Sequence, residues 1–220
     1  MLLLLPGGKG SMPIPLFTID GVIPPFVGAD GPGGAPQNST PYAVTPIEVA
    51  STLGDTSRRA EIIRDWLEHR RLLRGLGVTS GFQWLDGSFV EQKEPSDLDV
   101  VTFFRRPAGA RSAPEIEALW RANPEVFQRQ PVRSKRRLDA FFIDLDAASE
   151  AIVDQSRYYF GLFSHRREDF LWKGMLRASL TDEDDDPALA VLGSGCAGEM
   201  ETVDMGFVGT EAVDGEQASG

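Results

Sequence analysis

The chain has one cysteine, Cys196, and only two histidines among its 220 residues. A single cysteine cannot form an intramolecular disulfide, and the sequence has no Cys/His cluster of the kind that binds zinc. It also lacks a Gly-x-x-x-x-Gly-Lys loop and a Gly-x-Gly-x-x-Gly segment after a strand. These absences exclude a disulfide-rich scaffold, a Cys/His zinc site and two familiar nucleotide-binding loops.

Long apolar runs are absent as well. The apolar stretch at the beginning of the sequence, Met1–Leu5, ends at Pro6. The core of a signal peptide needs about 7–15 apolar residues, and a membrane-spanning helix needs about 20. We therefore expect a soluble cytoplasmic protein that has no membrane partner.

Basic residues are missing from the C-terminal segment. Residues 181–220 contain eleven Asp and Glu and no Lys or Arg, whereas residues 1–180 contain 22 of each sign. The net charge of −11 therefore comes from the last segment, and the body of the protein is neutral. High charge with low hydrophobicity predicts a disordered acidic tail over residues 181–220. A neutral body does not favour broad nucleic-acid binding, which relies on a basic surface.

Local patterns divide the rest of the chain into two parts. Residues 1–55 are rich in Pro and Gly and predict a partly flexible arm, followed by one domain over residues 56–180. Apolar residues at helical spacing predict a helix from about Ser57 to Gly75. Other patterns predict helices at 114–123 and 149–163, and strands at about 138–143 and 174–180.

The most informative run is Trp84–Phe104. It contains Gly87-Ser88 and then, nine residues after Ser88, the pair Asp97-x-Asp99 at the start of an apolar, β-rich stretch. Residues two apart on a strand project from the same face, so the two carboxylates are expected side by side. Neighbouring carboxylates repel each other unless a cation lies between them, and Mg²⁺ prefers such oxygen ligands.

This arrangement resembles the signature of the nucleotidyltransferase superfamily, the polymerase-β-like fold, in which a Gly-Ser turn precedes an Asp-x-Asp strand and a later strand supplies a third acid. Asp139 stands where that third acid is expected, in the string RLDAFFIDL. That string and WLDGSFV also look like an uncharacterised bacterial group of small stand-alone nucleotidyltransferase-like proteins. The resemblance covers about residues 56–180. It implies an α+β fold in which a short mixed sheet carries the carboxylates and helices flank the sheet.

The resemblance also implies a metal-dependent transfer of an NMP group from an NTP to a hydroxyl acceptor. By position, Asp97, Asp99 and Asp139 become ligands of Mg²⁺ or Mn²⁺, and Asp139 becomes the candidate base. Gly87 and Ser88 become contacts to the nucleotide phosphates. The implied partners are the NTP, with ATP the expected one, and an acceptor that is a protein, a small molecule or an RNA end.

Cationic residues surround the third acid in the sequence. A run without any acidic residue precedes Asp139, and further cations follow it: Arg129, Arg133, Lys135, Arg136 and Arg137, then His165, Arg166, Arg167 and Lys173. We expect them to form a cationic rim for the triphosphate, with Arg137 and Lys173 as the leading contacts.

Other carboxylates and His69 have simpler expected roles. Asp144 is the alternative third acid, and Asp86 is placed to hydrogen-bond the Gly-Ser loop. His69 lies between charged residues on its predicted helix and is expected to be solvated.

Two other functions stay open. The first is a catalytically inactive module on the same fold that binds a nucleotide or a protein, which would be favoured if Asp139 pointed away from the Asp97–Asp99 pair. The second assigns the main role to the acidic tail, as a segment that binds a partner or mimics nucleic acid. It ranks last because runs of like charge are usually solvated surface.

Overall fold

The structure is a computed structural model that describes residues 14–195. Within these residues, five strands form one sheet in the order β1-β5-β2-β3-β4. The strands are β1 Tyr42–Val44, β2 Gly81–Asp86, β3 Leu98–Phe104, β4 Leu138–Asp144 and β5 Leu176–Ser179. Strand β3 pairs antiparallel with β2 and parallel with β4, so the sheet is mixed. The predicted α+β fold class is confirmed.

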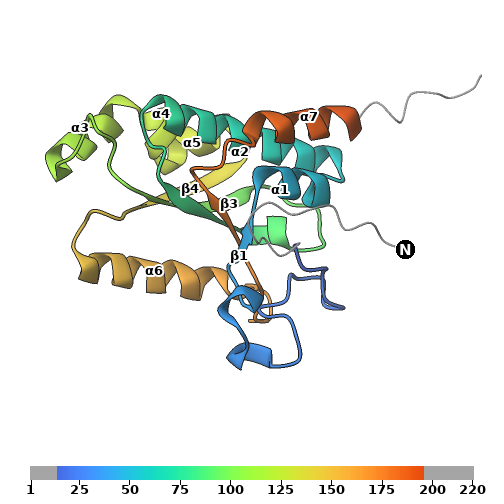
Figure 1. The fold of residues 1–220 in the computed structure, drawn as a ribbon. Coiled ribbons are helices and arrows are strands. Elements are labelled where there is room, and N and C mark those ends of the chain that lie inside the picture. The colour runs from blue at the N-terminus through green and yellow to red at the C-terminus, as the bar shows by residue number, and fades with distance from the viewer. Residues whose placement is uncertain (1–13, 196–220) are drawn as a thin grey trace, which may run out of the picture.

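Helices cover both faces of the sheet, with α6 on one face and α1, α2 and α7 on the other (Figure 1). The α-helices are α1 Pro46–Leu53, α2 Ser57–Gly75, α3 Ala113–Ala122, α4 Pro124–Phe127, α5 Arg129–Lys135, α6 Ser149–Phe163 and α7 Asp185–Gly195. Three short 3₁₀ helices, η1 Gly31–Gly33, η2 Pro36–Asn38 and η3 Gly87–Val90, lie in the connections. The predicted helices at 57–75, 114–123 and 149–163 are confirmed to within a residue of these bounds.

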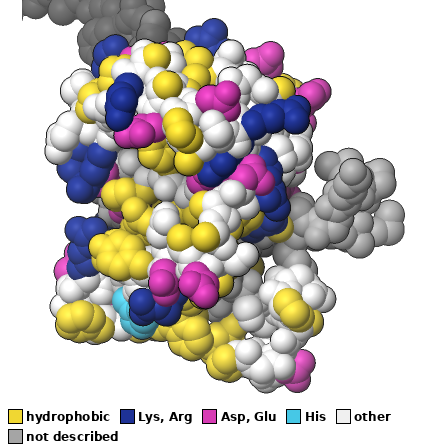
Figure 2. All heavy atoms as spheres, turned by 90° about the vertical axis from the view of Figure 1, so that its left-hand side faces the viewer, with side chains coloured by type: hydrophobic (Ala, Val, Ile, Leu, Met, Phe, Trp, Pro, Cys, Tyr) yellow, Lys and Arg dark blue, Asp and Glu magenta, His cyan; other side chains and the backbone are white. Residues whose placement is uncertain are grey.

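The surface mixes charges of both signs. On the face shown in Figure 2, Lys and Arg side chains lie among Asp and Glu side chains and do not gather into one large basic patch. None of the helices described in residues 14–195 is long and apolar enough to span a lipid bilayer.

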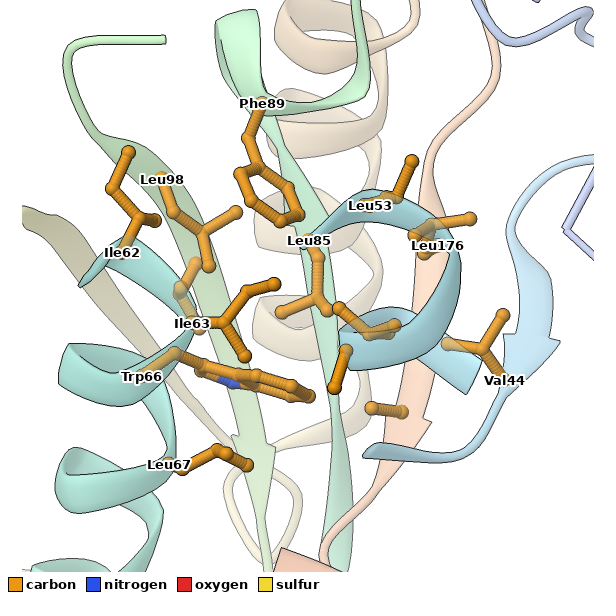
Figure 3. Close-up of a cluster of buried hydrophobic side chains, with 14 of the residues drawn as sticks. Val44, Leu53, Ile62, Ile63, Trp66, Leu67, Leu85, Phe89, Leu98 and Leu176 are labelled. Carbon is orange, nitrogen blue, oxygen red and sulfur yellow. The ribbon is translucent and has the colours of Figure 1, made fainter. Parts of the chain in front are cut away.

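Helix α2 forms because its start is capped and one of its faces is apolar. The side chain of Thr56 accepts a hydrogen bond from the backbone N–H of Arg59, 3.2 Å away, which satisfies a free donor in the first turn. Ile62, Ile63 and Trp66 of α2 are fully buried against Leu85 and other apolar side chains of the sheet (Figure 3). This packing holds β2 and β3, which carry the Gly-Ser turn and the Asp-x-Asp pair, in fixed positions.

The opposite face of the sheet packs against α6. Trp84, Phe103 and Ile143 from three strands form a cluster with Phe163 at the end of α6. The rings of Trp84 and Phe160 meet edge to face, with centroids 6.1 Å apart. The last turn of α6 lies beside the end of the sheet that carries Asp86 and Asp99, because Leu162 and Phe163 surround the same pocket as these carboxylates.

The segment before residue 56 is part of the domain, so the prediction of a separate arm over residues 1–55 is wrong for the described residues. Strand β1 pairs in parallel with β5, and Val22 and Ile23 are buried. Helix α1 begins with a capping box formed by Thr45 and Glu48. Pro and Gly shape turns here, but contacts with distant residues supply the order that local composition does not reveal. Residues 1–13 lie outside the described residues.

The predicted disorder from residue 181 is wrong for residues 181–195. Helix α7 packs on α1 and α2, where Ala188 and Leu192 are buried in the main core. The negative charge of Asp185 in the first turn of α7 is neutralised by α2, because Asp185 forms ion pairs with Arg70 and Arg74. Residues 196–220, including Cys196, lie outside the described residues.

His69 is also buried and not solvated. Its Nε2 lies 2.9 Å from the carbonyl oxygen of Val126, which can only accept, so Nε2 carries the proton. Nδ1 is buried without a hydrogen-bond partner. Burial, with a further contribution from Arg136, lowers the pKa of His69 to about 4. The imidazole is therefore neutral in the folded protein and protonated in the unfolded chain at mildly acidic pH.

Acidification should therefore weaken the fold through His69. The lowered pKa means that the folded protein binds fewer protons than the unfolded chain between about pH 6.5 and pH 4, so stability falls as pH falls through this window. We expect His69→Phe to remove this loss, so that the drop in unfolding free energy from pH 7.5 to pH 5 becomes about 2 kcal/mol smaller. Urea unfolding at both pH values measures it. The exposed His165→Gln is the control, and an equal pH dependence in wild type and His69→Phe would contradict the prediction.

Candidate functional site

Three aspartates form a row across neighbouring strands. Asp86 at the end of β2 pairs in register with Asp99 of β3, and Asp99 pairs in register with Asp139 of β4. Positions paired across strands project from the same face, which here is the face that carries α6. The structure therefore brings Asp99 and Asp139 together, and it adds Asp86 on the other side of Asp99.

Asp97 lies one residue ahead of β3, in the loop and not on the strand. It nevertheless shares one pocket of about 190 Å³ with Asp99, Gly87 and Ser88. The other side chains around this pocket come from the end of β2, the loop after η3, the end of α6 and the segment before β5: Asp86, Glu91, Lys93, Ser96, Leu162, Phe163, His165, Arg167, Glu168 and Lys173. The pocket therefore lies between the Gly-Ser turn and the Asp-x-Asp pair.

Two of these carboxyl groups have raised pKa values. Burial, followed by the charges of Asp97 and Asp139, raises the pKa of Asp99 to about 6. Burial raises the pKa of Asp86 to about 7, although Lys173 acts in the opposite direction. Converging carboxylates with raised pKa values in a pocket are typical of sites that bind cations or move protons.

The Gly-Ser turn touches the carboxylate directly. Gly87 has φ +78°, a left-handed conformation that favours glycine, and a Cβ at this position would overlap Oδ2 of Asp99. Lys173 Nζ donates to the carbonyl oxygen of Gly87 over 2.8 Å and thereby holds the turn in place. Glycine is needed here both for the backbone conformation and for the close approach to Asp99.

Gly87→Ala should therefore displace the Asp99 carboxylate. A methyl group adds backbone strain of about 1–2 kcal/mol and pushes against Oδ2. We expect Mn²⁺ affinity to fall about tenfold, equivalent to about 1.4 kcal/mol, as measured by electron paramagnetic resonance of free Mn²⁺. Gly161→Ala is the matched control, because no atom lies within 4 Å of a Cβ built at that exposed position of α6. Equal affinities of Gly87→Ala and wild type would contradict the contact.

The two leading predicted phosphate contacts have different positions. Lys173 lines the pocket, but its buried ammonium also lies 3.2 Å from Glu91 and 3.3 Å from Asp86. Lys173 therefore stabilises the Gly-Ser turn through its hydrogen bond to the carbonyl oxygen of Gly87. Arg137 is not brought to the pocket. Its guanidinium forms ion pairs with Asp65 and Glu61, which lie one helical turn apart on α2. These contacts hold Arg137 toward the face of the sheet that α2 covers.

Asp139 is covered by arginines. Arg129 Nε and Nη2 lie 2.5 Å from Oδ1 and Oδ2 of Asp139, and Arg133 lies 3.3 Å from Asp97. Asp139 does not line the pocket, because both of its carboxylate oxygens face these guanidinium groups. As the side chains lie, no three His, Cys, Asp or Glu residues within 14–195 are grouped as metal ligands.

The pocket nevertheless contains carboxylate oxygens, which are the kind of ligand that divalent cations prefer in proteins. Asp97 and Asp99 both line the pocket, and burial, followed by the charges of Asp97 and Asp139, raises the pKa of Asp99. Asp139 lies in register with Asp99 on the neighbouring strand, and Arg129 binds both of its carboxylate oxygens. Asp144, the alternative third acid, lies at the other end of β4 and pairs with Arg106, so it is too far along the strand to join them.

A family model described as "Family of unknown function (DUF6932)" matches residues 15–179 of the chain. The chain belongs to this family. The family match includes the whole sheet, the aspartate row and every residue around the pocket, while α7 follows it. No curated protein and no solved structure matches the chain.

The sequence did not reveal that Asp86 lies beside Asp99 or that Arg129 binds Asp139. Phe82, Trp84 and Asp86 occupy every second position of β2, and this spacing predicts that all three lie on the same face of the sheet. The pairing of Asp86 with Asp99 depends on the strand register, for which the sequence has no local signal. Arg129 belongs to the cationic run that was expected to form a rim, but its bidentate contact with Asp139 follows from the position of α5 beside β4.

Proposed function

We propose that the protein is a metal-dependent nucleotidyltransferase that moves an NMP group from an NTP, preferably ATP, to a hydroxyl acceptor. The observation that carries this proposal is the in-register pair Asp99–Asp139 on adjacent parallel strands, beside Asp97 and the Gly-Ser turn. Two acids on adjacent strands and a third in the loop before β3, next to a glycine turn, would provide both cation ligands and a place for phosphate groups.

The reaction requires in-line attack at the α-phosphorus. The acceptor oxygen forms a bond to that phosphorus, the bond to the oxygen bridging the α- and β-phosphates breaks, and pyrophosphate leaves. Mg²⁺ or Mn²⁺ held by Asp97, Asp99 and Asp139 would supply positive charge for the attacking and leaving oxygens. Gly87 and Ser88 position the phosphates, Arg167 at the pocket wall adds a positive charge, and Asp139 is the candidate acceptor of the hydroxyl proton.

The acceptor is a protein, a small molecule or an RNA end. Charges of both signs are interspersed on the face in Figure 2, which does not favour a broad nucleic-acid footprint, although a local groove can hold an RNA end. The NTP requirement and the single cysteine support a cytoplasmic location.

The second candidate is an inactive module that binds a nucleotide or a protein. One observation favours it: Arg129 occupies both carboxylate oxygens of Asp139, as an internal counter-ion would in a protein that has lost its metal. Against it, Asp139 lies in register with Asp99, and its charge is one of the smaller causes, after burial and Asp97, that raise the pKa of Asp99. Holding three carboxylates together without a cation is unfavourable, which supports the catalytic candidate.

Transfer can be tested with each α-³²P-labelled NTP and Mg²⁺ or Mn²⁺ in a host lysate. Wild type is compared with the double variant Asp97→Asn/Asp99→Asn, and products are separated on gels that distinguish protein, RNA and small molecules. Label transferred only by the wild type supports the proposed function and reveals the acceptor class. No transfer, together with no metal-dependent NTP binding by calorimetry, would exclude it.

A further inference from the structure

Two arginines on one face of α5 lie over the acidic site. Arg129 and Arg133 are one helical turn apart, so their side chains project together. Arg129 binds Asp139 through two parallel contacts, and Arg133 bridges Asp97 at 3.3 Å and Asp139 at 3.8 Å. The two guanidinium groups therefore connect the same carboxylates that would hold a divalent cation.

These arginines are much more exposed than the acid they cover. The side chains of Arg129 and Arg133 are 51% and 50% exposed, whereas that of Asp139 is 8% exposed. Because both guanidinium groups reach solvent, water can solvate them when a cation takes their place beside Asp139. In contrast, Arg136 and Arg137 on the same segment bind carboxylates of α2.

We infer that Arg129 and Arg133 form a polyphosphate-binding pair that also serves as the counter-ion of the acidic site when no metal is bound. A divalent cation at Asp97, Asp99 and Asp139 replaces the arginines as counter-ion. The released guanidinium groups then bind phosphate oxygens of the NTP, for which their planar two-donor geometry is suited. This inference rests on the proposed function and extends it, because it makes metal loading the event that frees the arginines.

The inference predicts opposite effects of one substitution on two ligands. Arg129→Ala removes the competitor for Asp139, so affinity for Mn²⁺ alone is expected to increase about fivefold to tenfold. The same variant loses a phosphate contact, so affinity for tripolyphosphate in the presence of saturating Mn²⁺ is expected to fall at least about tenfold. Free Mn²⁺ is measured by electron paramagnetic resonance, and tripolyphosphate binding by calorimetry.

Two further variants complete the test. Arg129→Lys keeps the charge without the two-donor geometry and should lie between wild type and Arg129→Ala for both ligands. Arg121→Ala removes an arginine of α3 that is 73% exposed and pairs with Glu117, away from the pocket, and should change neither affinity. Circular dichroism verifies that all variants are folded.

The outcomes separate this inference from the proposed function. Tighter Mn²⁺ binding with weaker tripolyphosphate binding in Arg129→Ala supports the inference, even if no label is transferred from any NTP. Unchanged affinities, or weaker Mn²⁺ binding, would overturn it, because Arg129 would then be inert or structural. Wild-type protein that binds neither probe also overturns it. Tripolyphosphate contains no nucleotide, so none of these readings depends on catalysis.

Discussion

Asp99→Asn is expected to slow the proposed nucleotidyl transfer strongly while making the folded protein more stable. Asp99 is the central carboxylate of the row and lines the pocket, so its loss should weaken Mn²⁺ binding at least about a hundredfold and slow transfer about a thousandfold. The change in stability has the opposite sign. Because the pKa of Asp99 is raised to about 6, the carboxylate destabilises the fold above that pH, and a neutral amide removes this penalty.

The gain in unfolding free energy at pH 7.5 is expected to be about 2 kcal/mol, less than the full pKa shift implies because the site is partly solvated. Urea unfolding, Mn²⁺ titration and the transfer assay are performed on the same preparation. Asp144→Asn, which removes the carboxylate at the other end of β4, serves as the control and should leave Mn²⁺ affinity unchanged. A less stable Asp99→Asn protein with unchanged Mn²⁺ affinity would identify Asp99 as a structural residue.

Asp185→Ala should cause the largest loss of stability, about 3 kcal/mol of unfolding free energy. Asp185 Oδ1 accepts a hydrogen bond from Arg70 Nε over 2.8 Å, and Arg74 pairs with the other oxygen. The side chain of Arg70 is fully buried, and burial already lowers its pKa, so removal of Asp185 leaves a buried charge with less compensation. The remaining contacts of Arg70 with Ser179 O and Gln83 limit the loss.

The matched control is Asp186→Ala, the exposed next residue of α7, which should change stability by less than about 0.5 kcal/mol. Both variants remove one negative charge from the same helix start, so the comparison isolates the ion pair with α2. Thermal and urea unfolding measure the difference. Equal effects of the two substitutions would show that α7 is not held to the domain through Asp185.

Local sequence signals predicted several elements closely. Helix α6 spans Ser149–Phe163 as predicted, and α3 begins after the predicted cap Ser112, whose capping box with Glu115 fixes the start. These features are encoded within a few residues of one another. The same local spacing placed Asp97 and Asp99 together, and strand β3 begins one residue later than that spacing assumed.

Local signals failed where distant residues supply the partner. The acidic run before α7 resembles a disordered segment, but Arg70, more than a hundred positions earlier, neutralises Asp185. His69 has charged neighbours in sequence, yet it faces Val126 and Phe142 in the interior. In both cases composition describes the segment alone, whereas burial is decided by what packs against it.

The sequence by itself determined the main helices and the spacing of Asp97 and Asp99, because helical periodicity, capping and strand alternation act between near neighbours. The α+β class was implied by the resemblance that the Gly-Ser and Asp-x-Asp motifs carry. Only the tertiary structure decided that Asp86 joins Asp99 and Asp139, that Arg137 turns toward α2, and that Arg129 covers Asp139. Strand register and the docking of α5 and α7 depend on contacts between residues far apart in the chain. Such contacts leave no periodic pattern in a single sequence.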